Sequence, residues 1–173
     1  MSRLHPDRVT SLCAAVVADC ACEGIRRAAR AVSKVYAGAL AGVGLTPTQL
    51  AILVATRLHD SLPLTRLAQG LHLDRTSLYR ALGPLERKGY LKLGPGRTQR
   101  ERVATVTARG ERVLREALPI WENTQQRFIA ALGPRAWAAL SSSVRQVVAV
   151  AQALSPSARA HRRQPGRRPS ARD

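Results

Sequence analysis

The stretch 63–106 constrains the fold more than any other part of the chain. Two short helical patterns, at about 64–71 and 74–88, are separated by a tight turn, and a basic hairpin that contains glycines follows them. This order is typical of a winged helix-turn-helix, in which the second helix lies in the major groove of DNA. The segment therefore predicts a mainly α fold with a small β-hairpin wing, and double-stranded DNA as the partner.

The second helix of this motif should begin at Asp74, because aspartate is a good N-cap. Its leucines at positions 78, 82 and 85 would face inward and leave the first turn exposed. Arginine can bind guanine through two hydrogen bonds, and hydroxyls can bond to bases or phosphates. The candidate DNA contacts on this helix are Arg75, Thr76, Ser77 and Arg80. Further candidates, for phosphate or a narrow minor groove, lie in the wing and are Arg97, Arg100 and Arg102.

The charge of the chain favours a polyanionic partner. Lysine and arginine number 28 against 11 acidic residues, which gives a formal charge of +17. Part of this excess lies in the motif itself, where residues 75–102 hold eight basic and two acidic side chains. Six arginines also lie in the Pro- and Ser-rich end, 155–173, which we expect to be disordered.

Long amphipathic helical patterns flank the motif, at about 9–40, 108–132 and 135–154. A further helix at about 47–59 has a strong start, because Thr46, Pro47 and Gln49 form a capping box with proline in the first turn. The outer helices carry more apolar surface than one winged domain of residues 45–107 can cover. We therefore expect regions 1–44 and 108–154 to form a homodimer that holds two recognition helices one DNA turn apart.

Four strings give the chain a family resemblance: IRRAARAV from Ile25, GLTPTQLAIL from Gly44, LDRTSLYRALGPLERKGYL from Leu73 and VTARG from Val106. In this order and spacing they resemble the MarR family of bacterial transcription regulators, over roughly residues 20–154. The resemblance implies a winged homodimer on a pseudo-palindromic site, and it places the wing-tip arginine at Arg100. The chain departs from the family pattern at Thr98, where the family often has an aspartate that steadies the wing.

Three cysteines, Cys13, Cys20 and Cys22, lie near the N-terminus, and their odd number favours a reducing cytoplasm over a disulfide scaffold. Some members of the family are thiol switches. Cys22 precedes Tyr36 by fourteen residues, a spacing similar to that of the hydroperoxide-sensing branch, so Cys22 is the candidate redox sensor. Arg26, one turn further on, would favour a thiolate, whereas Glu23 would oppose it. A structural, buried role for the cysteines and a metal site are the alternatives.

The resemblance also implies a second means of control, a small aromatic or phenolic ligand between the winged domain and the dimer helices. The candidate polar residues for such a pocket are Arg26, Tyr36 and His59. The main interpretation is thus a dimeric repressor released by a ligand or by an oxidant. The alternative is an architectural nucleic-acid-binding protein that has no effector.

Enzymatic function is not indicated by the sequence. It contains no nucleotide-binding loop, no metal-ligand cluster and no Ser-His-Asp arrangement, and its four histidines are scattered. We therefore expect no catalytic residue, no cofactor and no bound metal. No window of about 18 uninterrupted apolar residues predicts a membrane span, and no signal peptide is evident, so we expect a cytoplasmic protein.

Overall fold

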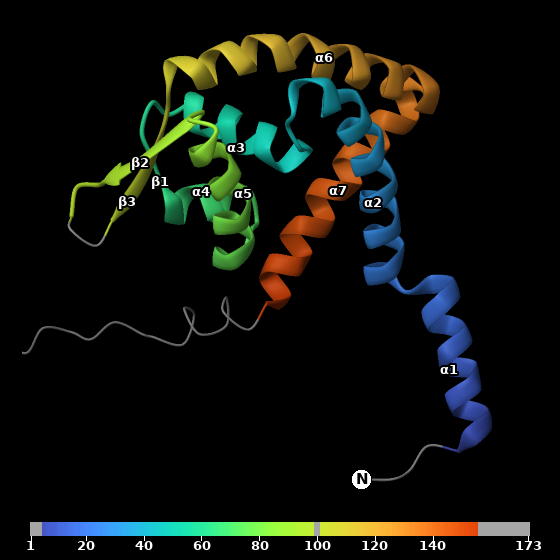
Figure 1. Ribbon diagram of the computed structural model, residues 1–173. Helices are drawn as coiled ribbons and strands as arrows, with labels where there is room; N and C mark the ends of the chain where they lie inside the picture. Colours follow the sequence, from blue (N-terminus) through green and yellow to red (C-terminus); the bar gives the residue numbers. More distant parts are fainter. Residues whose placement is uncertain (1–4, 99–100, 156–173) are drawn as a thin grey trace, which may run out of the picture. The chain divides into compact units, whose positions relative to one another are not determined.

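The structure, a computed structural model, describes residues 5–98 and 101–155. The elements in chain order include α1 (Pro6–Asp19), α2 (Ala21–Leu40), the 3-10 turn η1 (Ala41–Val43), α3 (Pro47–Arg57), β1 (Leu62–Pro63), α4 (Leu64–Gly70), α5 (Arg75–Arg87), β2 (Leu91–Pro95), β3 (Arg102–Val106), α6 (Ala108–Leu132) and α7 (Pro134–Leu154) (Figure 1). The expected fold class, mainly helical with a small wing, is confirmed. The expected disordered tail and Arg100 lie outside the described residues.

The N-terminal helical pattern, expected at about 9–40, is divided into two helices. Helix α1 ends at Asp19, Cys20 has an extended backbone (φ −72°, ψ 113°), and α2 begins at Ala21. Gly24 lies inside α2 and donates its N–H to the carbonyl of Cys20. Neither proline nor glycine marks the break at Cys20, so the periodicity of the sequence could not locate it.

Helix α3 starts at the capping box that the sequence predicts. The Thr46 hydroxyl accepts from the N–H of Gln49 at 3.2 Å, and the Gln49 side chain accepts from the N–H of Thr46 at 3.0 Å. The helix then buries Ile52 and Leu53 completely. It provides the central support on which α4 and α5 pack.

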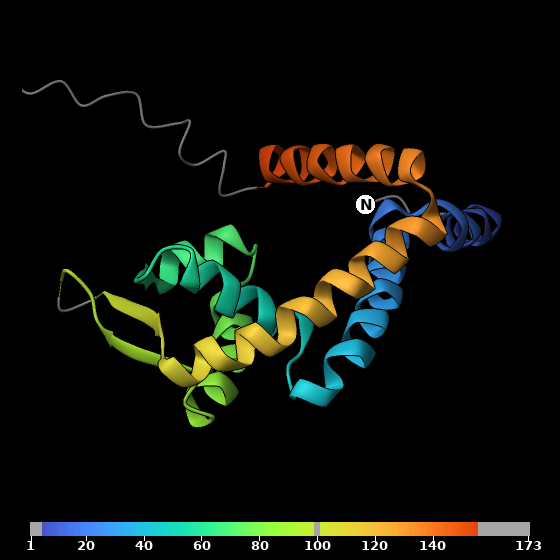
Figure 2. The same cartoon turned by 90° about the horizontal axis from the view of Figure 1, so that it is seen from above.

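The sheet has three antiparallel strands in the order β1-β3-β2. The wing strands pair from Leu91 opposite Val106 to Pro95 opposite Arg102, and β1 adds Leu62 opposite Ala104. Figure 2 shows the β2–β3 hairpin extending away from α3, α4 and α5. The two-residue β1 was not expected, because a run of two residues carries no alternation in sequence.

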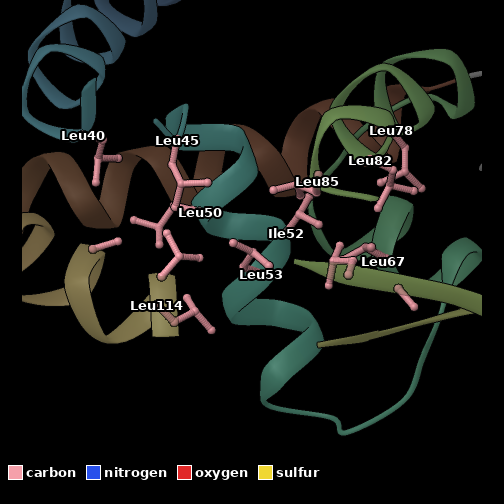
Figure 3. Packing of buried hydrophobic residues seen from close by; sticks show 14 of the residues in the cluster. Leu40, Leu45, Leu50, Ile52, Leu53, Leu67, Leu78, Leu82, Leu85 and Leu114 are labelled. Carbon is pink, nitrogen blue, oxygen red and sulfur yellow. The ribbon is translucent and has the colours of Figure 1, made fainter. Parts of the chain in front are cut away.

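The core lies where α3, α4 and α5 meet the sheet and the first turns of α6. Figure 3 shows Leu78, Leu82 and Leu85 of α5 directed toward the α3 and α4 side chains, and all three are at most 1% exposed. Gly110 of α6 approaches the backbone of Tyr90 so closely that a Cβ would overlap its carbonyl oxygen. Burial of this kind contributes about 1.5–3 kcal/mol for each large apolar side chain, which fixes the orientation of α5.

The chain divides into two compact units within α6, between Thr124 and Gln125. In the second unit, α6 ends before Gly133, whose φ of 92° suits glycine, and α7 begins at Pro134. Phe128 and Trp137 pack edge to face across this turn, with their ring centroids 6.4 Å apart. The expected domain boundaries at 44/45, 107/108 and 154/155 remain predictions.

Candidate DNA-binding surface

The start of α5 is fixed by its N-cap. One Asp74 carboxylate oxygen accepts from the N–H of Ser77 at 2.9 Å, and the other accepts from the Ser77 hydroxyl at 2.6 Å. These hydrogen bonds favour the ionised carboxylate and lower the pKa of Asp74 below its usual value. The predicted cap is therefore present, and it sets which side chains of the first turn face outward.

The outward face of α5 carries the polar side chains that the sequence predicts. Arg75, Thr76 and Arg80 are exposed, while the leucines of the same helix lie in the core. Ser77 is half-buried and its hydroxyl belongs to the Asp74 cap, so a contact from Ser77 to DNA stays a prediction.

Tyr79 also lies on this face, and sequence reasoning missed it. Its side chain is 42% exposed, and the guanidinium of Arg75 lies 5.7 Å from the centre of its ring. Residues four apart meet on one side of a helix, and a cation over an aromatic face is attracted to it. The spacing of Arg75 and Tyr79 in the sequence was the signal that could have identified the pair.

The turn between α4 and α5 closes through a left-handed residue. His72 has φ 50°, and it follows α4 with the two hydrogen bonds of a Schellman motif, His72 to Gln69 and Leu73 to Ala68. Few residues other than glycine adopt this conformation. His72 therefore has a backbone role in setting the angle between the two helices.

Of the three wing arginines that the sequence predicts as DNA contacts, two lie among the described residues. Arg97 and Arg102 are exposed, and Arg102 starts β3 opposite Pro95 of β2. Between them, Glu101 is half-buried and its carboxylate accepts from the N–H of Arg97 at 2.8 Å. Sequence reasoning did not assign Glu101 a role.

A separate, mostly apolar pocket of about 280 Å³ lies between α2, α3 and the first part of α6. Its lining residues are Tyr36, Leu40, Pro47, Leu50, Ala51, Val54, Leu118 and Trp121. Burial raises the pKa of the Tyr36 phenol. Only Tyr36 of the three predicted polar liners is at this pocket.

Arg26 and His59 do not line this pocket, so their place at a ligand site stays a prediction. Arg26 precedes Tyr36 by ten residues on α2, or about 15 Å along the helix axis. His59 follows the end of α3 and lines a different opening, with Arg66 and Leu71 of the α4 region. The spacing of Arg26 and Tyr36 in the sequence already implied their separation on one helix, whereas the position of His59 depends on the fold.

All three cysteines are free thiols, and Cys13 and Cys22 are exposed. Cys22 lies in the first turn of α2, and Glu23 beside it pairs with Arg30 at 2.6 Å. Cys20 has an extended backbone and is the N-cap of α2, so it lies just outside the helix that contains Cys22. Within the described residues, no three His, Cys, Asp or Glu side chains are grouped as a metal site.

Within residues 5–98 and 101–155, no single helix is both long enough and apolar enough to cross a membrane, although the segment Pro6–Val43 and the helix Pro47–Arg57, bent by 73° relative to each other, would qualify by length and composition as a pair.

No family model and no curated protein matches the sequence. Among solved structures, the M. tuberculosis transcriptional regulator MosR in complex with DNA is 31% identical, with a TM-score of 0.66, over 76% of this chain and 98% of MosR. MosR without DNA is 32% identical over the same shares. The chain belongs to the MarR family of transcriptional regulators.

More distant members of the MarR family share the fold. A mutant of MarR from E. coli, complexed with operator DNA, is 18% identical with a TM-score of 0.69 over 77% of this chain and 96% of MarR. BpsR of Bordetella bronchiseptica is 20% identical with a TM-score of 0.66 over 74% of this chain and 93% of its own. These more distant structures show the same fold, whereas the 31% identical MosR is a transcriptional regulator.

Proposed function

We propose that this MarR-family chain binds DNA sequence-specifically, with α5 as the recognition helix. The observation that carries the proposal is that α5 has one face buried in the core and an opposite face exposed to solvent. Leu78, Leu82 and Leu85 fix the helix in the core, and the opposite side exposes Arg75, Thr76, Tyr79 and Arg80. The structure of MosR, a 31% identical relative, in complex with DNA supports DNA as the partner.

In this proposal α5 reads bases and the wing contacts the backbone. Arg75 and Arg80 carry planar guanidinium groups suited to guanine, and Thr76 and Ser77 carry hydroxyls suited to bases or phosphates. The wing arginines Arg97, Arg100 and Arg102 bind phosphate or enter the minor groove.

The working form in this proposal is a homodimer, with residues 1–44 and 108–154 as the dimerisation regions. Support comes from apolar side chains that α1 and α7 leave uncovered. Neither helix has a buried residue, and the exposed large apolar side chains include Val16 and Val17 of α1 and Val144 and Val150 of α7. A second copy that covers these faces would set two α5 helices about 34–36 Å apart on a pseudo-palindromic site.

Repression is the proposed outcome, because a dimer tightly bound at an operator blocks access to a promoter. A small aromatic ligand in the Tyr36–Trp121 pocket would release it by favouring a different spacing of the recognition helices. The pocket supports this route, because it touches both α2, a proposed dimerisation helix, and α3, which supports α5. Oxidation of Cys22 is a second proposed route, supported by the exposure of this thiol.

The test begins with duplexes selected by the full-length protein from a random library. The proposal expects a palindromic consensus, bound about 10³-fold or more tightly than a shuffled duplex of equal length. Anisotropy titrations over a range of salt concentrations should show the preference persisting as both affinities fall. Equal affinities with the same salt slope would contradict it and favour the architectural protein instead.

A further inference from the structure

The loop that joins the wing strands is closed by one acidic residue. Pro95 pairs with Arg102 at the end of the hairpin, and Glu101 lies directly before this pair. The main chain of Glu101 bonds twice within the loop: its carbonyl accepts from Gly96 at 2.8 Å, and its N–H donates to Thr98 at 3.1 Å. Its side chain then bonds to the N–H of Arg97 at 2.8 Å.

The position of this carboxylate depends on the glycine at 96. A Cβ on Gly96 would lie 2.5 Å from a carboxylate oxygen of Glu101 and 2.6 Å from its Cγ. These distances are shorter than real contacts, so a side chain at 96 would displace the carboxylate. The backbone of Gly96 does not have a positive φ, so alanine there meets the carboxylate without backbone strain.

The charge of Glu101 is unfavourable for the proposed use of the wing. It is flanked in sequence by Arg100 and Arg102, in a segment that would approach phosphates. A carboxylate there repels DNA and weakens binding unless it contributes something else. A hydrogen bond from a backbone N–H to a carboxylate is charge-assisted, and it orders the loop before DNA arrives.

We propose that Glu101 is a positioning residue for DNA binding: its carboxylate closes the wing loop over Gly96 and holds Arg97 in place for the phosphate backbone. In this proposal Glu101 supplies acidic support to a wing that has Thr98 where the family pattern often has an aspartate. This inference rests on the proposed DNA-binding function and assigns a role within that same surface.

The two possible roles of Glu101 predict changes of opposite sign. If the carboxylate closes the loop, Glu101→Ala should weaken binding to the selected duplex, about three- to tenfold for one lost hydrogen bond of this kind. Glu101→Gln keeps an acceptor oxygen and removes the charge, so it should bind as tightly as wild type or more tightly. A matched control is Glu86→Ala, an exposed acidic residue of α5, which should not weaken binding.

Because the position of the Glu101 carboxylate depends on Gly96, a substitution at Gly96 gives a second, independent test. Gly96→Ala should weaken binding to the same extent as Glu101→Ala, and the double variant should be no weaker than either single variant. Fully additive losses, or a Glu101→Ala variant that binds as tightly as Glu101→Gln, would overturn the proposal.

Loop closure can also be measured without DNA. Amide hydrogen exchange at Arg97 should accelerate in Glu101→Ala and Gly96→Ala but not in Glu101→Gln, at unchanged thermal stability. If wild type binds no duplex while these exchange rates behave as expected, the proposed function fails and the loop closure stands. Unchanged exchange at Arg97 in Glu101→Ala, beside normal DNA binding by wild type, would overturn the role of Glu101 alone.

Discussion

The Nζ of Lys88 donates a 2.7 Å hydrogen bond to the carbonyl oxygen of Gly44. Lys88 is the C-cap of α5, and Gly44 ends the turn that follows α2, with φ 65°. The two residues are 44 positions apart, so this bond joins the proposed recognition helix directly to the end of a proposed dimerisation helix. The ammonium of Lys88 also lies 5.9 Å from the centre of the Tyr90 ring.

Lys88→Met should therefore destabilise the fold by about 0.5–1.5 kcal/mol, since it removes the bond to Gly44. Methionine keeps a flexible chain that can pack on the Tyr90 ring, so the loss reports the hydrogen bond. Urea unfolding measures the change in the free energy of unfolding. Lys92→Met is the control, because Lys92 is an exposed lysine of β2. Equal stabilities for the two variants would contradict a structural link through Lys88.

The Asp74 cap predicts a pH dependence of stability. The pKa of Asp74 is lowered in the folded protein by its bonds to Ser77, so its contribution is present above the unfolded pKa of about 3.9 and is lost as pH falls through the lower folded value. Asp74→Ser keeps an N-cap that does not titrate. As pH falls below about 4, the free energy of unfolding of wild type should decrease more than that of Asp74→Ser. Parallel curves for the two proteins would contradict this role.

Base recognition by α5 is tested at Arg80. If Arg80 contacts a base edge, Arg80→Ala should cost about 1–3 kcal/mol and relax the preference at one position of the selected duplex. Competition titrations with single-base variants of that duplex measure both effects. A uniform loss over all sequences would instead identify Arg80 as a phosphate contact.

If the pocket lined by Tyr36 binds the effector, a variant that fills it should lose the response to that ligand and keep DNA binding. Ala51→Leu would add apolar volume to the wall of a cavity of about 280 Å³ and compete with a bound ligand. We expect this variant to bind the selected duplex like wild type and to resist release by a panel of monocyclic phenols. Ala130→Leu in the second unit is a control outside the pocket. Release of both variants by the same phenol at the same concentration would exclude this pocket as the effector site.

Thiol control is tested at Cys22. Cys22→Ser should abolish release of DNA by hydrogen peroxide, because a hydroxyl cannot form a sulfenic acid. Cys13→Ser serves as the control, since Cys13 is also exposed but lies in α1. Peroxide-triggered release that persists in Cys22→Ser would eliminate a switch based on this thiol.

Local signals in the sequence predicted much of the fold. Thr46 with Gln49 fixed the start of α3, and Asp74 fixed the start of α5, because caps act through side chains within three residues. The expected end of this helix at about 88 agrees with the C-cap at Lys88, which Gly89 follows with φ 68°. Each of these features is decided by a few neighbouring residues.

Features that depend on distant contacts were not predictable in the same way. The position of His59 away from the Tyr36 pocket depends on the packing of α3 and α4, whereas the separation of Arg26 from Tyr36 follows from their spacing on one helix. The role of Glu101 depends on the hairpin returning to Gly96, and β1 depends on pairing with β3. The break at Cys20 carries no proline or glycine in the sequence.

The central proposal is a homodimer whose two α5 helices bind two half-sites at a fixed separation. Changing the spacing of the half-sites tests it most directly. The measurement is the affinity of the full-length protein for the selected palindrome and for the same half-sites separated by five additional base pairs. A dimer with recognition helices about 34–36 Å apart should lose most of its preference over a shuffled duplex, because half a helical turn moves one site to the opposite face. Equal affinities for both spacings would contradict a dimer that reads two half-sites at once.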